Sequence, residues 1–501
     1  MDELPKNWVK CSLGEIISTK KGRKPDSTAD FQKSGYIPYI LIDEMEGKPV
    51  RAYTNDPKVS VVNKGDVLLV WDGSIGKCGS GLEGAIGSTL VGLTPLCDIP
   101  TKLVEYLLMF NNSLIKATST GTGLQHINKD FFKICEIFLP PLTEQQRIVT
   151  KVDLLFAQID IIKNSLKRVP ELLKIFRQQV LTQAVNGKLT EEWRKDYHLI
   201  AVSNSDLESE RERVKKNNAL LSGKKSFSYK KSIEPILNIN TKGIDEFHHI
   251  PESWRWLSLD QILWNVSDGP HFSPSYVSSL EGKRFISMRN VSEKGIDFSD
   301  CKYVSYQNHV EFIKRGKPEK DDILYTKGGS TGIACNVGND NDFSYWVHVA
   351  LLKPVSKFVD SIYLKNILNS NLCYKQAQAF THGVGNQDLG LTRLIKIAFP
   401  LPSLSEQHEI VRRVESLFAK ADAIEEQYMA LKEKIDILPQ AILHKAFKGE
   451  LTEQLDTDGD AADLLKEIQK LKESVTKSKK PKPYASKEEL QMVAEASEII
   501  N

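Results

Sequence analysis

The chain has 501 residues, 41% of them hydrophobic and 26% charged, with a formal net charge of +2. This length predicts about two to four domains, and the near-neutral charge means that an anionic partner would have to contact local basic patches. No apolar run approaches the roughly 18 residues of a membrane span, and the charged start MDELPKNW lacks a signal-peptide apolar region, so we expect a cytoplasmic protein without a membrane partner.

The cysteines give no sign of a metal site or a disulfide framework. There are seven, an odd number, and none of them forms a Cys-x-x-Cys pair. This pattern is typical of reduced thiols, which agrees with a cytoplasmic location.

Residues 1–140 are predicted to form a mixed α/β domain, because the short runs IPYILI, VSVV and DVLLVW alternate with Gly, Asn and Asp turns. Within this domain, STKKGRKP (18–25) places four cations on a predicted loop. Both a solvated loop and a phosphate-binding loop fit this stretch. As DNA-binding candidates it supplies Lys20, Lys21, Arg23 and Lys24.

Two glycine-rich polar turns follow in the same domain, WDGSIGK (71–77) and TSTGTGLQH (118–126). Glycine allows backbone N–H groups to approach phosphates closely, and Thr, Asn, Gln and Lys side chains donate to phosphates or base edges. The turns therefore predict the DNA-binding residues Ser74, Lys77, Thr120, Thr122, Gln125 and His126.

Residues 141–195 are predicted to form a first helical segment. Thr143 and Gln146 fit a capping box after Pro141, and Pro170 is expected to interrupt or kink the helix. Apolar residues recur in alternating steps of four and three, which indicates a coiled-coil seam. The seam consists of Ile148, Val152, Leu155, Ile159, Ile162, Leu166 and Val169.

Residues 196–244, rich in Ser, Asn, Lys and Glu, are predicted to be a linker. Residues 245–402 read as a second α/β domain, in which GKRFISMRN (282–290), TKGGSTG (326–332) and THGVGNQD (381–388) carry side chains suited to bases and phosphates. The candidates there are Arg284, Arg289, Asn290, Lys327, Ser330, Asn386 and Gln387.

Residues 403–455 are predicted to form a second helical segment, with Pro439 expected to interrupt or kink it, and residues 456–501 a tail whose KSKKPKP stretch (477–483) is exposed. The second segment continues the seam spacing. Its seam consists of Ile410, Val414, Leu417, Ala421, Ile424, Tyr428, Leu431, Ile435 and Leu438.

The chain is a tandem duplication. TEQQRIVTKVDLLFAQID (143–160) and SEQHEIVRRVESLFAKAD (405–422) share 9 of 18 residues at an offset of 262. Matches nearer the start of each half have smaller offsets, 246 for the opening WxxxxL stretches and 256 for the glycine-rich turns. Each half therefore pairs a domain of variable length with a helical segment in strict register.

A coiled-coil seam needs a partner, and the simplest partner for each helical segment is the other copy, running antiparallel. A helix over 143–169 would span roughly 40 Å at about 1.5 Å per residue, close to the roughly 34 Å of one DNA turn. The alternative is that each helix packs only on its own domain.

The sequence lacks the common catalytic motifs. GSIGKCGS (73–80) does not have P-loop spacing, and no G-x-G-x-x-G follows a predicted strand. LPPL (139–142) has the prolines but not the polar and aromatic residues of an amino-methyltransferase motif. Asp26, Glu46 and Lys48 leave open a cryptic nuclease site, a pattern that arises often by chance. The chain is therefore predicted to be non-catalytic, with no cofactor or metal of its own.

Four stretches carry a resemblance to a known family. They are LPPLTEQQRIVTKVDLLFAQID, LPSLSEQHEIVRRVESLFAKAD, FRQQVLTQAVNGKLTEEWR and LPQAILHKAFKGELTEQ, and the W-x-x-x-x-L starts at Trp8 and Trp254 add to them. In these stretches the chain resembles the specificity subunits of type I restriction–modification systems.

The resemblance implies two target-recognition domains that each read one half of an asymmetric double-stranded DNA site, with the coiled coil fixing the spacer. It also implies two modification subunits that carry S-adenosylmethionine and methylate adenine N6. Two restriction subunits that use ATP and Mg would translocate and cut the DNA. A non-catalytic protein-interaction scaffold with two α/β binding domains is the alternative interpretation.

Overall fold

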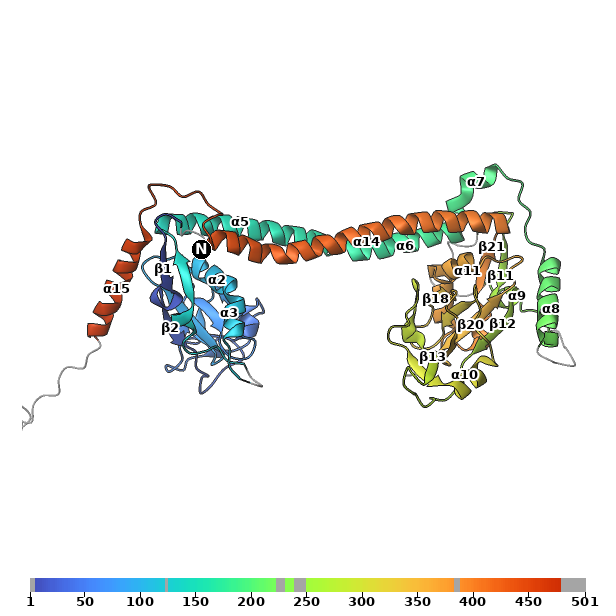
Figure 1. The fold of residues 1–501 in the computed structure, drawn as a ribbon, viewed down its shortest axis with the longest axis horizontal. Coiled ribbons are helices and arrows are strands. Elements are labelled where there is room, and N and C mark those ends of the chain that lie inside the picture. Colours follow the sequence, from blue (N-terminus) through green and yellow to red (C-terminus); the bar gives the residue numbers. More distant parts are fainter. Residues whose placement is uncertain (1–4, 122–124, 222–229, 238–248, 383–387, 479–501) are drawn as a thin grey trace, which may run out of the picture. The chain divides into compact units, whose positions relative to one another are not determined.

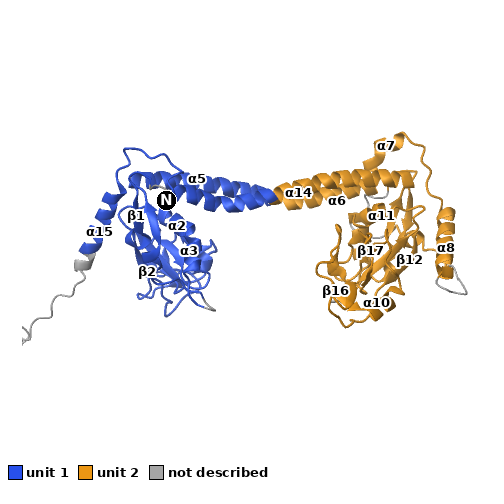
Figure 2. Cartoon of the chain, in the orientation of Figure 1, with its two compact units in different colours: residues 1–167, 430–501 blue, residues 168–429 orange. Residues whose placement is uncertain are grey.

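The computed structural model describes residues 5–121, 125–221, 230–237, 249–382 and 388–478. The chain divides into two compact units (Figure 2): unit 1 comprises residues 1–167 and 430–501, and unit 2 comprises residues 168–429. Each unit contains one mixed α/β domain and parts of the long helices (Figure 1).

Unit 1 begins with the N-terminal α/β domain. Its strands are β1 (Val9–Ser12), β2 (Ile17–Lys21), β3 (Ile37–Ile40), β4 (Tyr53–Thr54), β5 (Val61–Val62), β6 (Val67–Val70), β7 (Cys78–Ser80), β8 (Gly84–Ile86), β9 (Leu90–Pro95) and β10 (Glu136–Leu139). Its helices are η1 (Leu13–Glu15), α1 (Ile42–Met45), α2 (Thr101–Phe110), α3 (Asn112–Ala117), α4 (Phe131–Ile134), α5 (Leu142–Leu166) and α15 (Ala461–Ser478), with the last part of α14.

The central sheet of unit 1 has the order β2-β9-β6-β7, beside a second sheet β4-β3-β8-β5 in which β3 and β8 are parallel. All four residues of β6 are buried. Val67 and Leu69 enter one core cluster, whereas Leu68 and Val70 enter another on the opposite face. Covering on both faces explains why DVLLVW reads as a continuous apolar run.

Unit 2 holds the second α/β domain. Its strands are β11 (Arg255–Ser258), β12 (Leu263–Asp268), β13 (Gly282–Ile286), β14 (Val291–Ser292), β15 (Gly295–Ile296), β16 (Lys302–Ser305), β17 (Ile323–Thr326), β18 (Ala334–Asn336), β19 (Phe343–Tyr345), β20 (Val349–Pro354) and β21 (Ala398–Leu401). Its helices are α6 (Val169–Val185), η2 (Lys188–Thr190), α7 (Glu191–Lys195), α8 (Asn204–Leu221), α9 (Leu259–Ile262), η4 (Met288–Asn290), α10 (Tyr306–Ile313), α11 (Ser361–Leu368), α12 (Asn371–Phe380), α13 (Leu391–Leu394) and the first part of α14 (Leu404–Phe447).

The domain of unit 2 repeats the central sheet topology of unit 1, which confirms the predicted tandem α/β fold. The sheet β12-β20-β17-β18 corresponds to β2-β9-β6-β7, the pair β11-β21 to β1-β10, and the parallel pair β13-β19 to β3-β8. A glycine follows the edge strand in both domains, and both positions admit no side chain. A Cβ at Gly22 would lie 2.0 Å from the carbonyl oxygen of Gly87, and one at Gly269 would lie 1.8 Å from that of Tyr345.

The long helices differ in part from the sequence prediction. α5 ends at Leu166 and α6 begins at Val169 with Pro170 in its first turn, so this proline separates two helices. α14 instead runs for 44 residues through Pro439 without ending. The predicted capping box is absent, because α5 begins at Leu142 and the Thr143 hydroxyl donates to Asp458 at 3.0 Å.

Each unit pairs its helices antiparallel. In unit 1, Ile148 near the start of α5 shares a core cluster with Leu443 near the end of α14, and Lys163 later in α5 pairs with Asp436 earlier in α14 at 3.1 Å. In unit 2, Arg177 of α6 pairs with Asp422 of α14 at 2.9 Å, and Thr190, after the end of α6, donates to Glu406 near the start of α14 at 2.8 Å.

Burial along the predicted seam is uneven. Ile148 and Val152 belong to the core of unit 1, and Ile410 and Val414 belong to that of unit 2. In the first turns of α5 and α14, each helix therefore also packs on its own α/β domain, as the alternative interpretation expected. Further residues are buried or half-buried where the helices pair: Leu155, Ile159, Leu166, Val169, Leu417, Ala421, Tyr428 and Ile435. Four predicted seam residues are instead exposed, because two helices alone bury only a narrow stripe: Ile162, Ile424, Leu431 and Leu438.

A buried glutamate joins the helix pair of unit 1 to its domain. The Glu144 carboxylate accepts hydrogen bonds from Trp8 Nε1 at 2.8 Å and from the Thr452 hydroxyl at 3.1 Å. Burial raises the pKa of Glu144 above its ordinary value, while these two donors act in the opposite direction. Next to it, the Arg147 guanidinium forms a bidentate pair with Asp458, with both N–O distances at 2.6 Å.

Unit 2 contains the same arrangement one repeat later. Glu406 is fully buried and accepts from Trp254 Nε1 and from the Thr190 hydroxyl, both at 2.8 Å, and it also pairs with Arg194. We call each set, Trp8–Glu144–Thr452 and Trp254–Glu406–Thr190, a glutamate lock. In both locks the glutamate lies at the start of one helical segment (141–195 or 403–455), and the threonine lies near the end of the other helical segment.

Two helices lie in segments that the sequence assigned to a linker and a tail. α8 packs on unit 2 through buried Leu207, and Arg211 donates to Leu263 O at 3.0 Å. α15 packs on unit 1 through buried Ile468, and Lys472 donates to Gly14 O at 2.7 Å. α8 presents few apolar residues, which hid its packing from composition alone. α15 instead carries Leu464, Leu465 and Ile468 at helical spacing, a pattern that the sequence interpretation missed.

We predict that Glu406→Ala lowers the free energy of unfolding by about 3 kcal/mol, because it leaves two buried donors and a partly buried arginine without their acceptor. Urea unfolding followed by circular dichroism measures the change. Lys420→Ala, on an exposed part of the same helix, is the control and should have little effect. Equal effects of both changes would contradict the lock.

Low pH should lower the stability of unit 2 through protonation of one carboxylate, that of Glu409. Hydrogen bonds from Arg412 and Arg413 lower the pKa of Glu409 from 4.5 to about 2. A depressed folded pKa gives stability that is present above the unfolded pKa and is lost as the pH falls towards 2. The unfolding temperature of Glu409→Gln should therefore fall less between pH 5 and 2.5 than that of the native protein, whereas the exposed control Glu426→Gln should behave like the native protein.

Candidate nucleic-acid interface

The basic stretch of unit 1 lies at a sheet edge. Ser18 to Lys21 belong to the edge strand β2 and not, as predicted, to a loop, and the chain then turns at Gly22. Lys20, Lys21, Arg23 and Lys24 are all exposed. None of these four forms an ion pair with a residue that the structure describes. Four cations on one exposed segment can contact phosphates.

The two glycine-rich turns of unit 1 meet each other. Gly73 N donates to Gln125 O at 2.9 Å, and Ile127 N donates to Trp71 O at 3.0 Å. His126 pairs with Thr120 through two backbone hydrogen bonds. The predicted residues Ser74, Thr120, Gln125 and His126 are therefore gathered on one exposed surface. Lys77 lies on the same turn but pairs with Glu46.

Unit 2 brings the equivalent segments together. Leu389 N donates to Lys327 O at 2.8 Å, and Asp388 N donates to His382 O at 3.1 Å. Ser330 is exposed at the tip of the turn, whereas the side chain of Lys327 is only 3% exposed and lies between two carboxylates. Direct contact of Lys327 with DNA is therefore disfavoured by its placement.

The three candidates on GKRFISMRN differ in placement. Arg289 is exposed. Arg284 pairs with Asp340 and stacks over Phe298, with 4.6 Å between the guanidinium carbon and the ring centroid. Asn290 is 5% exposed, and its amide donates to Asp297 O while its oxygen accepts from Ser287 N. Asn290 thus forms a capping box with Ser287 at the start of the short helix η4, and its placement does not support the prediction that it reads a base.

Three further candidates, Thr122, Asn386 and Gln387, lie outside the described residues. The residues of the nuclease alternative do not share a partner: Asp26 pairs with Lys58, Glu46 with Lys77 and Lys48 with Asp43. Across the described ranges, no group of three or more His, Cys, Asp or Glu residues is arranged to hold a metal ion.

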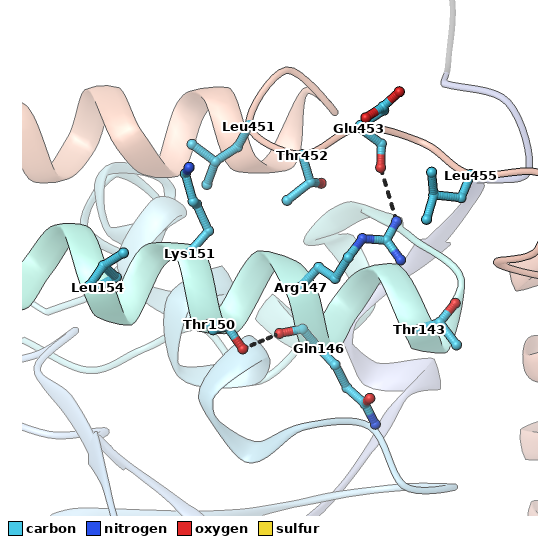
Figure 3. Close-up of a pocket in the computed structure, with 10 residues that line it drawn as sticks. All are labelled: Thr143, Gln146, Arg147, Thr150, Lys151, Leu154, Leu451, Thr452, Glu453 and Leu455. Atoms are coloured by element: carbon cyan, nitrogen blue, oxygen red, sulfur yellow. Dashed lines mark hydrogen bonds between the residues drawn. The ribbon is translucent and has the colours of Figure 1, made fainter.

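A groove lies beside the start of α5 in unit 1 (Figure 3), with a volume of about 540 Å³. Arg147 lies over it and donates to Glu453 O at 3.0 Å, as the dashed line in Figure 3 marks. The lining residues are Thr143, Gln146, Arg147, Thr150, Lys151, Leu154, Leu451, Thr452, Glu453 and Leu455.

The long helices also expose large apolar side chains. In unit 1 they include Leu154, Ile161 and Ile437, and in unit 2 Leu172 and Ile175. Apolar residues exposed in rows along a helix are typical of a surface that another protein covers. Of the helices that the structure describes, none has the length and apolar content needed to span a membrane.

Comparison with known families decides the identity of the fold. The model of the type I restriction modification DNA specificity domain matches residues 5–171 and again residues 240–433. The chain belongs to the specificity subunits of type I restriction–modification systems. A specificity subunit is the non-catalytic DNA-recognition component of such a system.

Two relatives of this specificity subunit match over nearly their whole length. The type I restriction enzyme EcoDI specificity subunit of Escherichia coli is 28% identical over 484 residues, covering 93% of this chain and 95% of the relative. The MjaVIII specificity subunit of Methanocaldococcus jannaschii is 24% identical, covering 89% of this chain and 94% of the relative.

Two solved structures share the fold. The chain superposes with a TM-score of 0.60 and 19% identity on a subunit from a study of complex assembly and conformational transition of the type I R-M system, covering 89% of this chain and 99% of that one. The HsdS subunit of Thermoanaerobacter tengcongensis gives a TM-score of 0.51 and 18% identity, with 89% of this chain and 98% of the other covered.

The sequence interpretation missed the two glutamate locks and Asp458. A signal for the locks was present, because Glu-Gln at the start and Leu-Thr-Glu at the end are identical in both repeats. Asp72 and Asp388, which lie at the meeting points of the turns, were also missed. They carry no repeat signal, since their positions hold different residues in the two halves.

Binding measurements should separate phosphate contacts from base readout. Lys20→Ala, Lys21→Ala and Lys24→Ala should weaken binding to all duplexes alike and reduce the salt slope by about one unit each. Gln125→Ala and Arg289→Ala should instead relax specificity, each at one half-site, with tenfold or so less discrimination at a base. Lys432→Ala, exposed on α14, is the control. Unchanged salt slopes in the lysine variants would show that the basic stretch is merely solvated.

Proposed function

We propose that this specificity subunit reads a bipartite, asymmetric DNA site, with one half-site for each α/β domain. One observation carries the proposal: each domain joins its glycine-rich turn (71–77 or 326–332) to a second loop (118–126 or 381–388) by backbone hydrogen bonds, and several equivalent positions hold different residues, as Asp72 and Gly328 or His126 and Asp388 do. Two domains that share a loop arrangement but differ in their side chains can recognise different base sequences. The exposed cations Lys20 to Lys24 would contact phosphates.

We further propose that the long helices set the spacing between the half-sites. α14 is one continuous helix of 44 residues, of which those up to 429 belong to unit 2 and those from 430 belong to unit 1. At about 1.5 Å per residue it is roughly 66 Å long. That is nearer two DNA turns of about 34 Å than the one turn expected from the shorter predicted helix.

The partners follow from the family and from the exposed helical surface. We propose that two modification subunits dock on the apolar rows that include Leu154, Ile161, Leu172 and Ile175. They would carry S-adenosylmethionine and methylate adenine N6. Two restriction subunits with ATP and Mg would complete the complex, which would act in the cytoplasm. The specificity subunit would recognise the DNA site and would bind no cofactor itself.

The spacing proposal predicts the outcome of a matched insertion. Seven helix-forming residues inserted after both Lys167 and Met429 keep the seam in register and lengthen each arm by about 10 Å, or roughly three base pairs. The complex with its modification subunit, selecting from random duplexes, should recover the same half-sites with a spacer about three base pairs longer.

The control places the same seven residues after Tyr197, between α7 and α8, and should leave the spacer unchanged. Altered half-site bases in the double insertion would contradict independent reading by the two domains. Failure of the unaltered complex to bind any duplex, even at low salt, would favour the protein-scaffold alternative.

A further inference from the structure

We propose that a polar side-chain pair in each domain clamps the glycine-rich turn to the second loop and so positions the reading surface. The pairs are Asp72–His126 in unit 1 and Lys327–Asp388 in unit 2, and we call them the loop clamps. They are positioning residues, which act through the side chains around them. The inference rests on the proposed reading of one half-site by each domain.

The clamp of unit 1 lies where the glycine-rich turn meets the second loop. Asp72 and His126 form an isolated antiparallel β-bridge, and His126 forms a second one with Thr120. His126 Nδ1 lies 2.7 Å from Asp72 Oδ1. Because an ionised carboxylate only accepts hydrogen bonds, the imidazole Nδ1 is the donor in this contact. His126 therefore joins the second loop to the turn through Asp72 and also bridges to Thr120 within the loop.

The clamp of unit 2 occupies the equivalent place. Gly328 and His382 both form β-bridges with Asp388, as Asp72 and Thr120 do with His126. Here the side-chain contact comes from Lys327, whose Nζ lies 3.3 Å from Asp388 Oδ1 and 3.4 Å from Asp268 Oδ2. Lys327 thereby also ties the end of edge strand β12 to the turn.

The two clamps reverse their polarity. In unit 1 the acid lies on the turn and the base on the second loop, whereas in unit 2 the base lies on the turn and the acid on the loop. His126 and Asp388 are equivalent at the offset of 262. The contact between the turn and the second loop is therefore present in both domains, although the acid and the base lie on opposite segments and Lys327 aligns with Trp71 instead of Asp72.

The clamp of unit 2 also has an electrostatic role. A carboxylate within a surface that contacts DNA repels phosphates unless a cation lies beside it. Lys327 provides that cation for Asp388, whereas His126 provides a hydrogen-bond donor for Asp72. A side chain held in a clamp is not free to contact a DNA base. We therefore reassign His126 and Lys327 from base contact to positioning. Base readout then falls to the residues that the clamps hold, such as Ser74, Gln125 and Ser330.

The test uses the full chain in complex with its modification subunit and a pool of random DNA duplexes, with the bound fraction sequenced. Asp72→Ala and His126→Ala should each reduce base discrimination at one half-site about tenfold and leave the other half-site unchanged. Asp388→Ala should do the same at the opposite half-site. The exchange Asp72→His with His126→Asp restores a pair of reversed polarity, as in unit 2, and should recover discrimination to within about threefold.

The matched control is Asp130→Ala, which removes an exposed carboxylate paired with Lys133 at 3.0 Å, near the second loop but outside the clamp. It should select the same bases as the native chain. Hydrogen exchange provides a second measurement, because loss of the clamp should speed exchange of the Gly73 and His126 amides several-fold while the β6 amides stay protected.

The clamp proposal would be wrong if the alanine variants still selected bases as sharply as the native chain at both half-sites. It would also be wrong if hydrogen exchange of the Gly73 and His126 amides were unchanged. An exchanged pair as defective as either single variant would also overturn them. Selection of no bipartite site by the native complex is a different result, since it would remove the proposed function itself.

Discussion

The architecture depends on one buried carboxylate that occurs twice. Glu144 and Glu406 each accept from a tryptophan at the start of a domain and from a threonine at the end of the other repeat. A buried acid without these donors would be costly, so both the domain and the end of the partner helix have to be present for either lock to form. Each lock therefore makes the antiparallel helix pair part of the folded unit and ties the start of one repeat to the end of the other.

This constraint separates what stays fixed from what varies. The helix starts, the locks and the strand order of the central four-stranded sheet are the same in both halves, and so are the glycines at 22 and 269 that admit no side chain. The exposed loops differ in length and in residues, since they contribute little to the core clusters. A scaffold of this kind lets exposed loops change while the core does not. The loop clamps fit this picture, because they keep one contact with different residues.

Much of this fold could be predicted from the sequence. The repeat offset, the apolar runs and the alternating spacing of four and three predicted two α/β domains and paired helices, because burial on both faces and a helical seam leave direct patterns. Other features leave no such pattern. The passage of α14 through Pro439 depends on tertiary packing, and the exposure of Ile162 and Ile424 depends on which neighbours cover the helix. For the candidate site, the glycine-rich turns were found. Burial of Lys327 depends on Asp268 and Asp388, which are distant in the sequence and which spacing does not encode, whereas Asn290 is held by nearby residues in a Ser287–Asn290 capping box that the sequence interpretation missed.

The most direct test of the account is a map of methylated adenines in DNA from cells that contain this chain and its modification subunit. Two domains that read independently at a helix-set distance predict one asymmetric motif, with two different specified halves separated by a gap of fixed length and one methylated adenine in each half. A single continuous motif, a palindromic motif or a gap of variable length would contradict the account.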